Sequence, residues 1–115
     1  MRRRNGIHDG AIDEIMLHPS SVGVERVVMA AKESVIFNGR RYEVASSPDV
    51  VLFLPNKSIK VVEFKSNGSS PNKEEALEQL DRSQELLEGY FGFDVTRIYA
   101  YRDQHTGKLR YELIH

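Results

Sequence analysis

The sequence predicts an α/β protein with a central mixed β-sheet and helices on both of its faces. Two apolar segments, 50–54 and 59–64, flank a Pro-Asn turn, so we expect them to pair as antiparallel strands. A segment with helical periodicity, 73–90, follows them, and two β-rich segments, 95–103 and 108–115, end the chain. Strands and helices in this order are typical of a layered α/β domain.

The composition limits the classes of protein to which this chain can belong. The chain has 115 residues, 40% of them hydrophobic and 29% charged, which is typical of one globular domain. It contains no cysteine, and this excludes disulfides, thiolate zinc sites and thiol nucleophiles. No apolar run has the length of a membrane span, and no signal-type segment follows the start. We therefore expect a soluble, cytoplasmic protein without a membrane partner.

The first third of the chain is expected to be loop, then helix, then hairpin. Residues 1–20 contain two glycines and a proline and show little periodicity, which predicts an extension with one helical turn at 13–17. Apolar residues recur at spacings of three and four over 24–31, which predicts a helix capped by Ser20 or Ser21. An Asn-Gly pair between β-rich flanks then predicts a hairpin.

The remaining elements complete the predicted sheet. The two central strands are apolar at nearly every position, which indicates burial on both faces. A loop rich in serine and asparagine leads to the long helix, for which Asn72 is the expected N-cap and Gly89 the expected stop. One face of this helix carries Leu77, Leu80, Gln84 and Leu87. The last two strands are expected to form a terminal hairpin.

Charged residues interrupt the second apolar strand. Glu63 and Lys65 are two residues apart, so their side chains leave the same face about 7 Å apart, whereas Phe64 points into the core. Asp49 begins the preceding strand, and pairing outward from the turn places it opposite approximately position 64. We therefore expect Asp49, Glu63 and Lys65 to meet at one end of the sheet.

This combination of residue types suits phosphodiester hydrolysis. Two carboxylates form a hard oxygen site, and backbone carbonyls and waters can complete the octahedral coordination that Mg²⁺ or Mn²⁺ prefers. Such a metal ion binds a phosphate oxygen and lowers the pKa of a bound water. A neighbouring lysine stabilises charge that develops on the phosphate, or orients the attacking water.

The spacing of these residues resembles the motif of the PD-(D/E)xK nuclease superfamily. Pro48-Asp49 is followed, after thirteen residues, by Glu63-Phe64-Lys65, and two valines precede the glutamate. The superfamily has the restriction endonuclease-like fold and includes archaeal Holliday junction resolvases and RecB-like nucleases. The resemblance implies one nuclease-like domain over 1–115, with an αβββαβ core at 22–101 and a terminal hairpin at 102–115.

The resemblance also assigns roles to residues. It implies a DNA endonuclease that depends on Mg²⁺ or Mn²⁺ and is selective for the structure of its substrate. Asp49 and Glu63 would be metal ligands, with the backbone carbonyl of Phe64 as a third. Lys65 would be the catalytic lysine. Glu25, on the expected first helix, would be a further ligand, direct or through water.

Substrate contacts and assembly follow in the same way. RecB-like members often carry a glutamine and, four residues later, a tyrosine on the helix after the lysine. Gln79 matches the first position and is the expected substrate contact, whereas Ser83 departs from the second. Arg2, Arg3 and Arg4 are expected to contact phosphates, with a solubilising tail as the alternative. A small domain offers little surface for a long duplex, so a homodimer is also expected.

Ordinary structural roles stand beside these functional ones. Glu63 and Lys65 could form an ion pair on an exposed strand face, and Asp49 could be an Asx-turn residue that begins a strand. Glu25 could be a first-turn acid of a helix. The corresponding functions are a catalytically silent nucleic-acid-binding module, or an interaction subunit, on the same fold. The four histidines show no ligand spacing and are expected at the surface.

Overall fold

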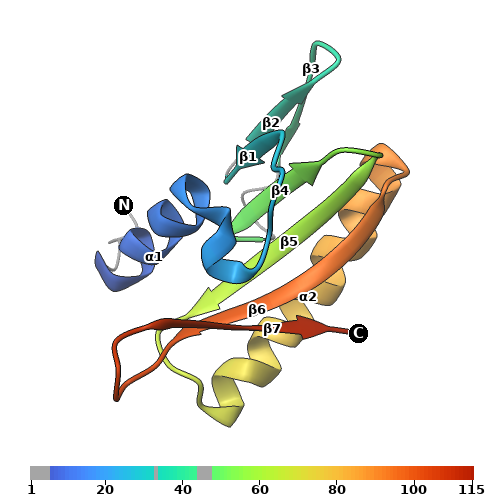
Figure 1. Cartoon of the computed structure of the whole chain (residues 1–115). Coiled ribbons are helices and arrows are strands. Elements are labelled where there is room, and N and C mark those ends of the chain that lie inside the picture. Colours follow the sequence, from blue (N-terminus) through green and yellow to red (C-terminus); the bar gives the residue numbers. More distant parts are fainter. Residues whose placement is uncertain (1–5, 33, 44–47) are drawn as a thin grey trace.

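The chain forms a five-stranded mixed sheet between two helices, with a separate two-stranded hairpin (Figure 1). This computed structural model describes residues 6–32, 34–43 and 48–115. The elements in chain order are α1 (Gly6–Leu17), the 3-10 helix η1 (Pro19–Val22), β1 (Met29–Ala31), β2 (Ser34–Phe37), β3 (Arg40–Glu43), β4 (Val50–Leu54), β5 (Ser58–Lys65), α2 (Ser70–Phe91), β6 (Asp94–Arg102) and β7 (Leu109–Ile114).

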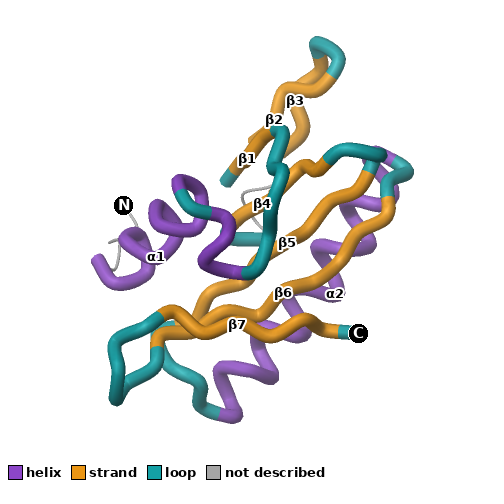
Figure 2. The backbone as a smooth tube through the Cα atoms, viewed as in Figure 1, coloured by secondary structure: helices purple, strands orange, loops and turns teal. Residues whose placement is uncertain are grey.

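The strands of the large sheet lie in the order β1-β4-β5-β6-β7. All neighbouring pairs are antiparallel except β5 and β6, which are parallel because α2 carries the chain back between them. The hairpin of β2 and β3 is inserted between β1 and β4 and projects from one end of the molecule (Figures 1 and 2). The mixed α/β character predicted from the sequence is confirmed.

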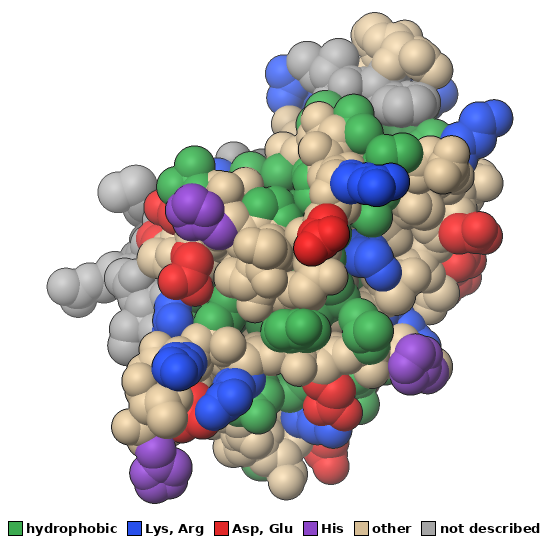
Figure 3. Space-filling view, in the orientation of Figure 1, with side chains coloured by type: hydrophobic (Ala, Val, Ile, Leu, Met, Phe, Trp, Pro, Cys, Tyr) green, Lys and Arg blue, Asp and Glu red, His purple; other side chains and the backbone are tan. Residues whose placement is uncertain are grey.

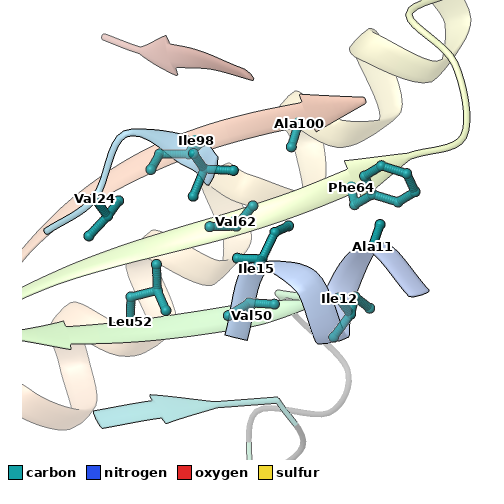
Figure 4. Packing of buried hydrophobic residues seen from close by; sticks show 11 residues of the cluster. Ala11, Ile12, Ile15, Val24, Val50, Leu52, Val62, Phe64, Ile98 and Ala100 are labelled. Atoms are coloured by element: carbon teal, nitrogen blue, oxygen red, sulfur yellow. The ribbon is translucent and has the colours of Figure 1, made fainter. Parts of the chain in front are cut away.

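Helix α1 covers one face of the sheet. Figure 4 shows its apolar side chains against alternate residues of the three central strands. Spacings of one and three residues place these side chains on one side of the helix. The buried residues of this cluster are Ala11, Ile12, Ile15, Val22, Val24, Val50, Leu52, Val62, Phe64, Ile98 and Ala100.

Helix α2 covers the opposite face. Successive strand residues point to opposite faces, so the strand residues that α1 leaves uncovered pack on α2. The buried residues of this second cluster are Ala31, Val51, Phe53, Ile59, Val61, Ala76, Leu80, Leu87, Val95 and Tyr99. Glu63 and Lys65 belong to this face by alternation, and Phe64 belongs to the other.

The predicted turns are confirmed where the structure describes them. Asn38 and Gly39 connect β2 and β3 with φ angles of 52° and 78°, the left-handed pair that such a two-residue turn requires. Pro55, Asn56 and Lys57 connect β4 and β5 in a three-residue loop, in which Asn56 and Lys57 have φ angles of 66° and 57°. The terminal hairpin of β6 and β7 is also present.

The prediction for residues 1–31 is wrong. The helix lies at Gly6–Leu17, where only a turn was expected, and residues 24–31 form an extended segment that ends in β1. Gly23 ends η1 with a φ of 74°, and Arg26 has a φ of 59°, so a right-handed helix cannot continue through them. The β-branched valines in this segment favour the extended form that pairs with β4.

The long helix is confirmed, but its limits were misplaced by about three residues. Ser69, rather than Asn72, is the N-cap, and its side chain accepts a hydrogen bond from the backbone N–H of Asn72. Gly92, rather than Gly89, ends the helix in the left-handed conformation. The buried residues are Ala76, Leu80, Ser83 and Leu87. Within the described residues, no helix has the length and apolar character needed to cross a membrane.

The contrast between two leucines tests this packing. Leu80 is fully buried under the sheet, whereas Leu17, at the end of α1, is 75% exposed. We expect Leu80→Ala to lower the free energy of unfolding by about 2–5 kcal/mol, because it leaves a cavity. The same substitution at Leu17 should change it by less than about 0.5 kcal/mol. Urea denaturation followed by circular dichroism measures both, and equal losses would contradict the packing.

Candidate functional site

The pairing of β4 with β5 brings the two predicted carboxylates side by side. Val50 pairs with Val62, and the backbone N–H of Asp49 donates to the carbonyl of Val62 at 3.1 Å. Asp49 is therefore level with Glu63, one residue from the expected register. The three-residue loop at 55–57 sets this register, because it brings Leu54 opposite its partner Ser58.

Both oxygens of the Asp49 side chain have partners. Oδ2 accepts a hydrogen bond from the backbone N–H of Phe64 at 2.8 Å. Oδ1 lies 3.1 Å from Nε2 of His8, which reaches the site from α1. The His8 ring also stands edge-on against the Phe64 ring, with 5.9 Å between their centroids. Contacts from β5 and α1 thus hold Asp49 in one orientation.

Glu63 is the most unusual residue of the site. Its side chain is buried, with 4% of the residue exposed, and its Oε2 has no hydrogen-bond partner among the described residues. Burial raises the pKa of Glu63 to about 9, and the charge of Asp49 and a hydrogen bond with its carboxyl group act in the same direction. The charge of Lys65 opposes this shift in pKa. At neutral pH the two neighbouring carboxyl groups therefore retain a proton between them.

Lys65 points to α2 and forms an ion pair there. Its Nζ lies 2.6 Å from Oε1 of Glu75, and the lysine side chain is 15% exposed. The hydrogen bond from Lys65 and its charge lower the pKa of Glu75. The ammonium group is thus held at the end of β5 by the helix that follows it.

Two stacked tyrosines lie beside the site on the neighbouring strand. Tyr99 pairs with Glu63 and Tyr101 with Lys65 across the β5–β6 ladder. The two rings are nearly parallel, at an angle of 29° with 5.4 Å between centroids. Gly68 gives the Tyr101 ring room, because a Cβ at this position would come within 2.9 Å of it. These rings form the wall of the site toward β6.

Gln79 lies on the same side of α2 as Glu75. The two residues are four apart, so they are neighbours on the helix surface. Gln79 is half-buried, and its Oε1 has no hydrogen-bond partner within the described part of the chain. The structure therefore places Gln79 one helical turn from the residue that binds Lys65.

The structure does not bring Glu25 to the other site residues. Glu25 is exposed and lies in the segment before β1 rather than on a helix. Met29 pairs with Phe53, so the chain preceding β1 lies beyond the end of β4, whereas Asp49 lies before its start. Since β4 spans five residues, Glu25 and Asp49 are at opposite ends of the sheet. The predicted arm Arg2-Arg3-Arg4 lies outside the described residues.

Sequence reasoning missed two residues of the site. His8 was expected at the surface, because no other histidine stands at a ligand spacing from it. Glu75 was not among the predicted site residues. Both contacts are long-range, and they depend on how α1 and α2 are laid over the sheet. The one local signal was the acidic start of α2, ten residues after Lys65.

The number of candidate metal ligands is small. Among the described residues, no three His, Asp or Glu side chains are grouped so that they could hold a metal ion together. The protein side chains that can contribute are the pair Asp49 and Glu63. Magnesium ions are commonly held by one or two carboxylates, with waters and substrate phosphates as the remaining ligands. No protein-family model, curated protein or solved structure shows significant similarity to this chain.

The pKa of Glu63 predicts how stability changes with pH. In the folded state the pKa of Glu63 is about 9, far above the ordinary value of a glutamate, so the folded protein keeps a proton that the unfolded chain loses. Stability should therefore fall as pH rises from about 5 to about 9. Glu63→Gln keeps a neutral side chain, and we expect it to raise the free energy of unfolding at pH 8 by about 2 kcal/mol, with little effect at pH 5.

Urea titrations in EDTA at pH 5 and pH 8 measure this difference. Glu78→Gln makes the same substitution on the exposed side of α2 and should leave stability unchanged at both pH values. A wild-type protein whose stability does not depend on pH, or a Glu63→Gln variant no more stable at pH 8, would contradict the expected pKa.

Proposed function

We propose that this protein is a metal-dependent endonuclease that hydrolyses DNA phosphodiester bonds. The observation that carries this proposal is the meeting of Asp49, Glu63 and Lys65 at the C-terminal end of β5, with Glu63 buried against a second carboxyl group. A buried acid whose pKa is strongly perturbed by burial and by a charged neighbour is a common feature of catalytic sites.

The carboxyl pair fits a divalent cation. Glu63 has a buried oxygen without a partner, and a proton now relieves the repulsion between Glu63 and Asp49. A cation can replace that proton, because it binds the ionised form of both groups. The N–H of Phe64 donates to Asp49, so the carbonyl of Phe64 points to the same edge of β5. Asp49, Glu63 and the Phe64 carbonyl would hold Mg²⁺ or Mn²⁺.

The bound cation would polarise a phosphate oxygen and lower the pKa of a bound water. The chain supplies the remaining interactions. Lys65 provides a positive charge that can stabilise the phosphate as negative charge develops on it. Glu75 holds the Lys65 ammonium near the end of the strand. Gln79 lies on the same side of α2 as Glu75, and its buried Oε1 has no hydrogen-bond partner among the described residues, which leaves it as the proposed substrate contact.

The topology supports a restriction endonuclease-like fold. With η1, the β2–β3 hairpin and the last strand β7 set aside, the elements follow the order α1, β1, β4, β5, α2, β6. This is the αβββαβ order of the superfamily, with β5 and β6 parallel on either side of the α2 crossover. The candidate residues lie at the start of the second strand and the end of the third strand of that core. This agreement supports the fold assignment and, with it, DNA as the substrate.

A second candidate is a nucleic-acid-binding module without catalysis. Two observations favour it: the Lys65 ammonium is already paired with Glu75 at 2.6 Å, and within the part of the chain that the structure describes no third side chain joins the carboxyl pair as a ligand. In this version the site would bind a phosphate or a cation without cleaving the substrate. Activity measurements separate the two candidates.

Cleavage of labelled DNA tests the proposal. We expect the protein to cut one or more of duplex, single-stranded, flap and four-way-junction DNA in Mg²⁺ or Mn²⁺ but not in EDTA. Lys65→Ala should lower the rate at least about 100-fold, because it removes the charge that stabilises the transition state. Lys60→Ala is the matched control, since Lys60 lies on the same strand but points to the opposite face.

Three results would decide against a nuclease of this mechanism. Cleavage that persists in Lys65→Ala, or that Lys60→Ala abolishes equally, would place the chemistry elsewhere. Binding of DNA without cleavage on every substrate would favour the silent module.

Metal binding gives an independent prediction. Mn²⁺ should raise the melting temperature of the wild-type protein, because a ligand that binds only the folded state stabilises it. The increase should be larger at pH 8 than at pH 6, since the ion competes with the proton that Glu63 retains. Asp49→Asn should abolish the increase, whereas Asp81→Asn, on the exposed surface of α2, should preserve it. Differential scanning fluorimetry measures all four cases.

A further inference from the structure

Strand β7 forms a long open edge of the sheet. It is the last strand in the order and has six residues, whereas β1, at the other edge, has only three. Native proteins usually protect a long edge with proline, bulges or charges, because its free N–H and carbonyl groups can pair with another strand. Within β7 there is no proline, and four consecutive residues, Arg110–Leu113, are exposed.

The hydrogen-bond pattern shows which backbone groups face the open edge. The N–H of Asp103 donates to the carbonyl of Lys108 at 2.8 Å, and Tyr101 pairs with Arg110 two residues further along. In an antiparallel ladder such hydrogen-bonded pairs alternate with pairs whose backbone groups point away. The N–H and carbonyl groups of Leu109, Tyr111 and Leu113 therefore point away from β6 to the open edge.

The residue order of β7 is self-complementary about Tyr111. The strand contains Leu-Arg-Tyr-Glu-Leu at 109–113. When two such segments run antiparallel about Tyr111, each leucine lies opposite a leucine and each arginine lies opposite a glutamate. We propose that two copies of this chain pair through their β7 strands, antiparallel, about a twofold axis at Tyr111. This register joins the two five-stranded sheets into one continuous sheet.

The proposed register satisfies both the backbone and the side chains. Tyr111 faces Tyr111 of the second copy, and Leu109 faces Leu113, so every outward backbone group meets another and about six hydrogen bonds form. Arg110 then lies opposite Glu112 of the second copy, twice by symmetry. These are non-hydrogen-bonded pairs, in which opposite side chains come closest and unlike charges stabilise the ladder.

A shift of this register would remove the complementarity. Moving one strand by two residues would keep the backbone bonds but place Arg110 opposite Arg110, or Glu112 opposite Glu112, of the second copy. Like charges directly opposite each other are destabilising. The charge pattern therefore selects the register centred on Tyr111.

The side chains are available for this contact. Tyr111 is 47% exposed and Leu113 is 43% exposed, and Figure 3 shows hydrophobic side chains between acidic and basic ones on the face where Figure 1 places β7. Arg110 now pairs with Asp103 at 3.2 Å, and Glu112 pairs with Lys73 at 3.1 Å. Both are surface ion pairs, which contribute little and can rearrange at small cost.

The pairing would also relate the two candidate sites. Lys65 pairs with Tyr101 and Tyr101 with Arg110, so the site lies two strands from β7 and level with its start. A twofold axis perpendicular to the sheet keeps both sites on the same face, roughly 25 Å apart from strand spacing alone. This consequence for two cleavage events rests on the proposed function, but the interface itself does not.

Analytical ultracentrifugation of the whole chain tests the interface. We expect a monomer–dimer equilibrium at protein concentrations between about 1 and about 200 µM, because an interface of this small size should dissociate within that range. Glu112→Arg places like charges opposite each other in the proposed register and should weaken the dimer at least tenfold. Arg110→Glu should do the same. A mixture of these two variants should restore the dimer, because each then offers the charge that the other needs.

The controls separate the interface from intrachain effects and from folding. Lys73→Ala removes the partner of Glu112 on α2 and should leave dimerisation unchanged or slightly stronger. Circular dichroism and the melting temperature confirm that each variant is folded. A wild-type protein that stays monomeric at 200 µM would overturn the proposal, and so would a dimer that neither charge substitution weakens, or a mixture in which dimerisation is not restored. None of these results depends on whether the protein cleaves DNA.

Discussion

The constraint on which the site depends is the placement of two carboxyl groups level with each other at the end of a buried strand pair. Pairing of Val50 with Val62 makes Asp49 the neighbour of Glu63, and α2 covers the face to which Glu63 points. The proton that Glu63 retains reduces the repulsion between the two carboxyl groups. Burial of this protonated acid lowers the stability of the protein at neutral pH, and the packing of the rest of the fold must offset that loss.

The layers on both faces of the sheet contribute to the same site. Helix α1 supplies His8 to one oxygen of Asp49, and the backbone of β5 supplies the N–H of Phe64 to the other. Helix α2 supplies Glu75 to Lys65. The residues of the motif are therefore oriented by partners from three separate elements, whose own positions come from two hydrophobic clusters, one on each face. Precise placement of a few polar groups by a rigid apolar scaffold is what catalysis or tight binding of a charged ligand requires.

The sequence predicted the features that local patterns determine. The Asn-Gly and Pro-Asn turns predicted both hairpin connections, and the apolar segments around the second turn predicted the central strands. The position of Asp49 opposite Glu63 was therefore predicted to within one residue. The first helix was misplaced because valines at helical spacing at 24–28 have an equally good place in an extended segment beside β4. The contacts of His8 and Glu75 could not be predicted, because they arise from tertiary packing between elements distant in the chain.

A simple surface ion pair does not account for the charged residues in β5. Such a pair would join Glu63 to Lys65, leave both exposed and lower the pKa of the glutamate. Instead Lys65 is paired with Glu75, while Glu63 is buried and shares a proton with Asp49, so its pKa is raised. A hydrophobic residue at position 63 would make the folded protein more stable, because burial of an uncompensated acid is costly. The presence of an acid there, beside a second acid, is a feature that the proposed binding of a cation by both acids would account for. The stability of the strand alone does not account for the residue types at this end of the sheet.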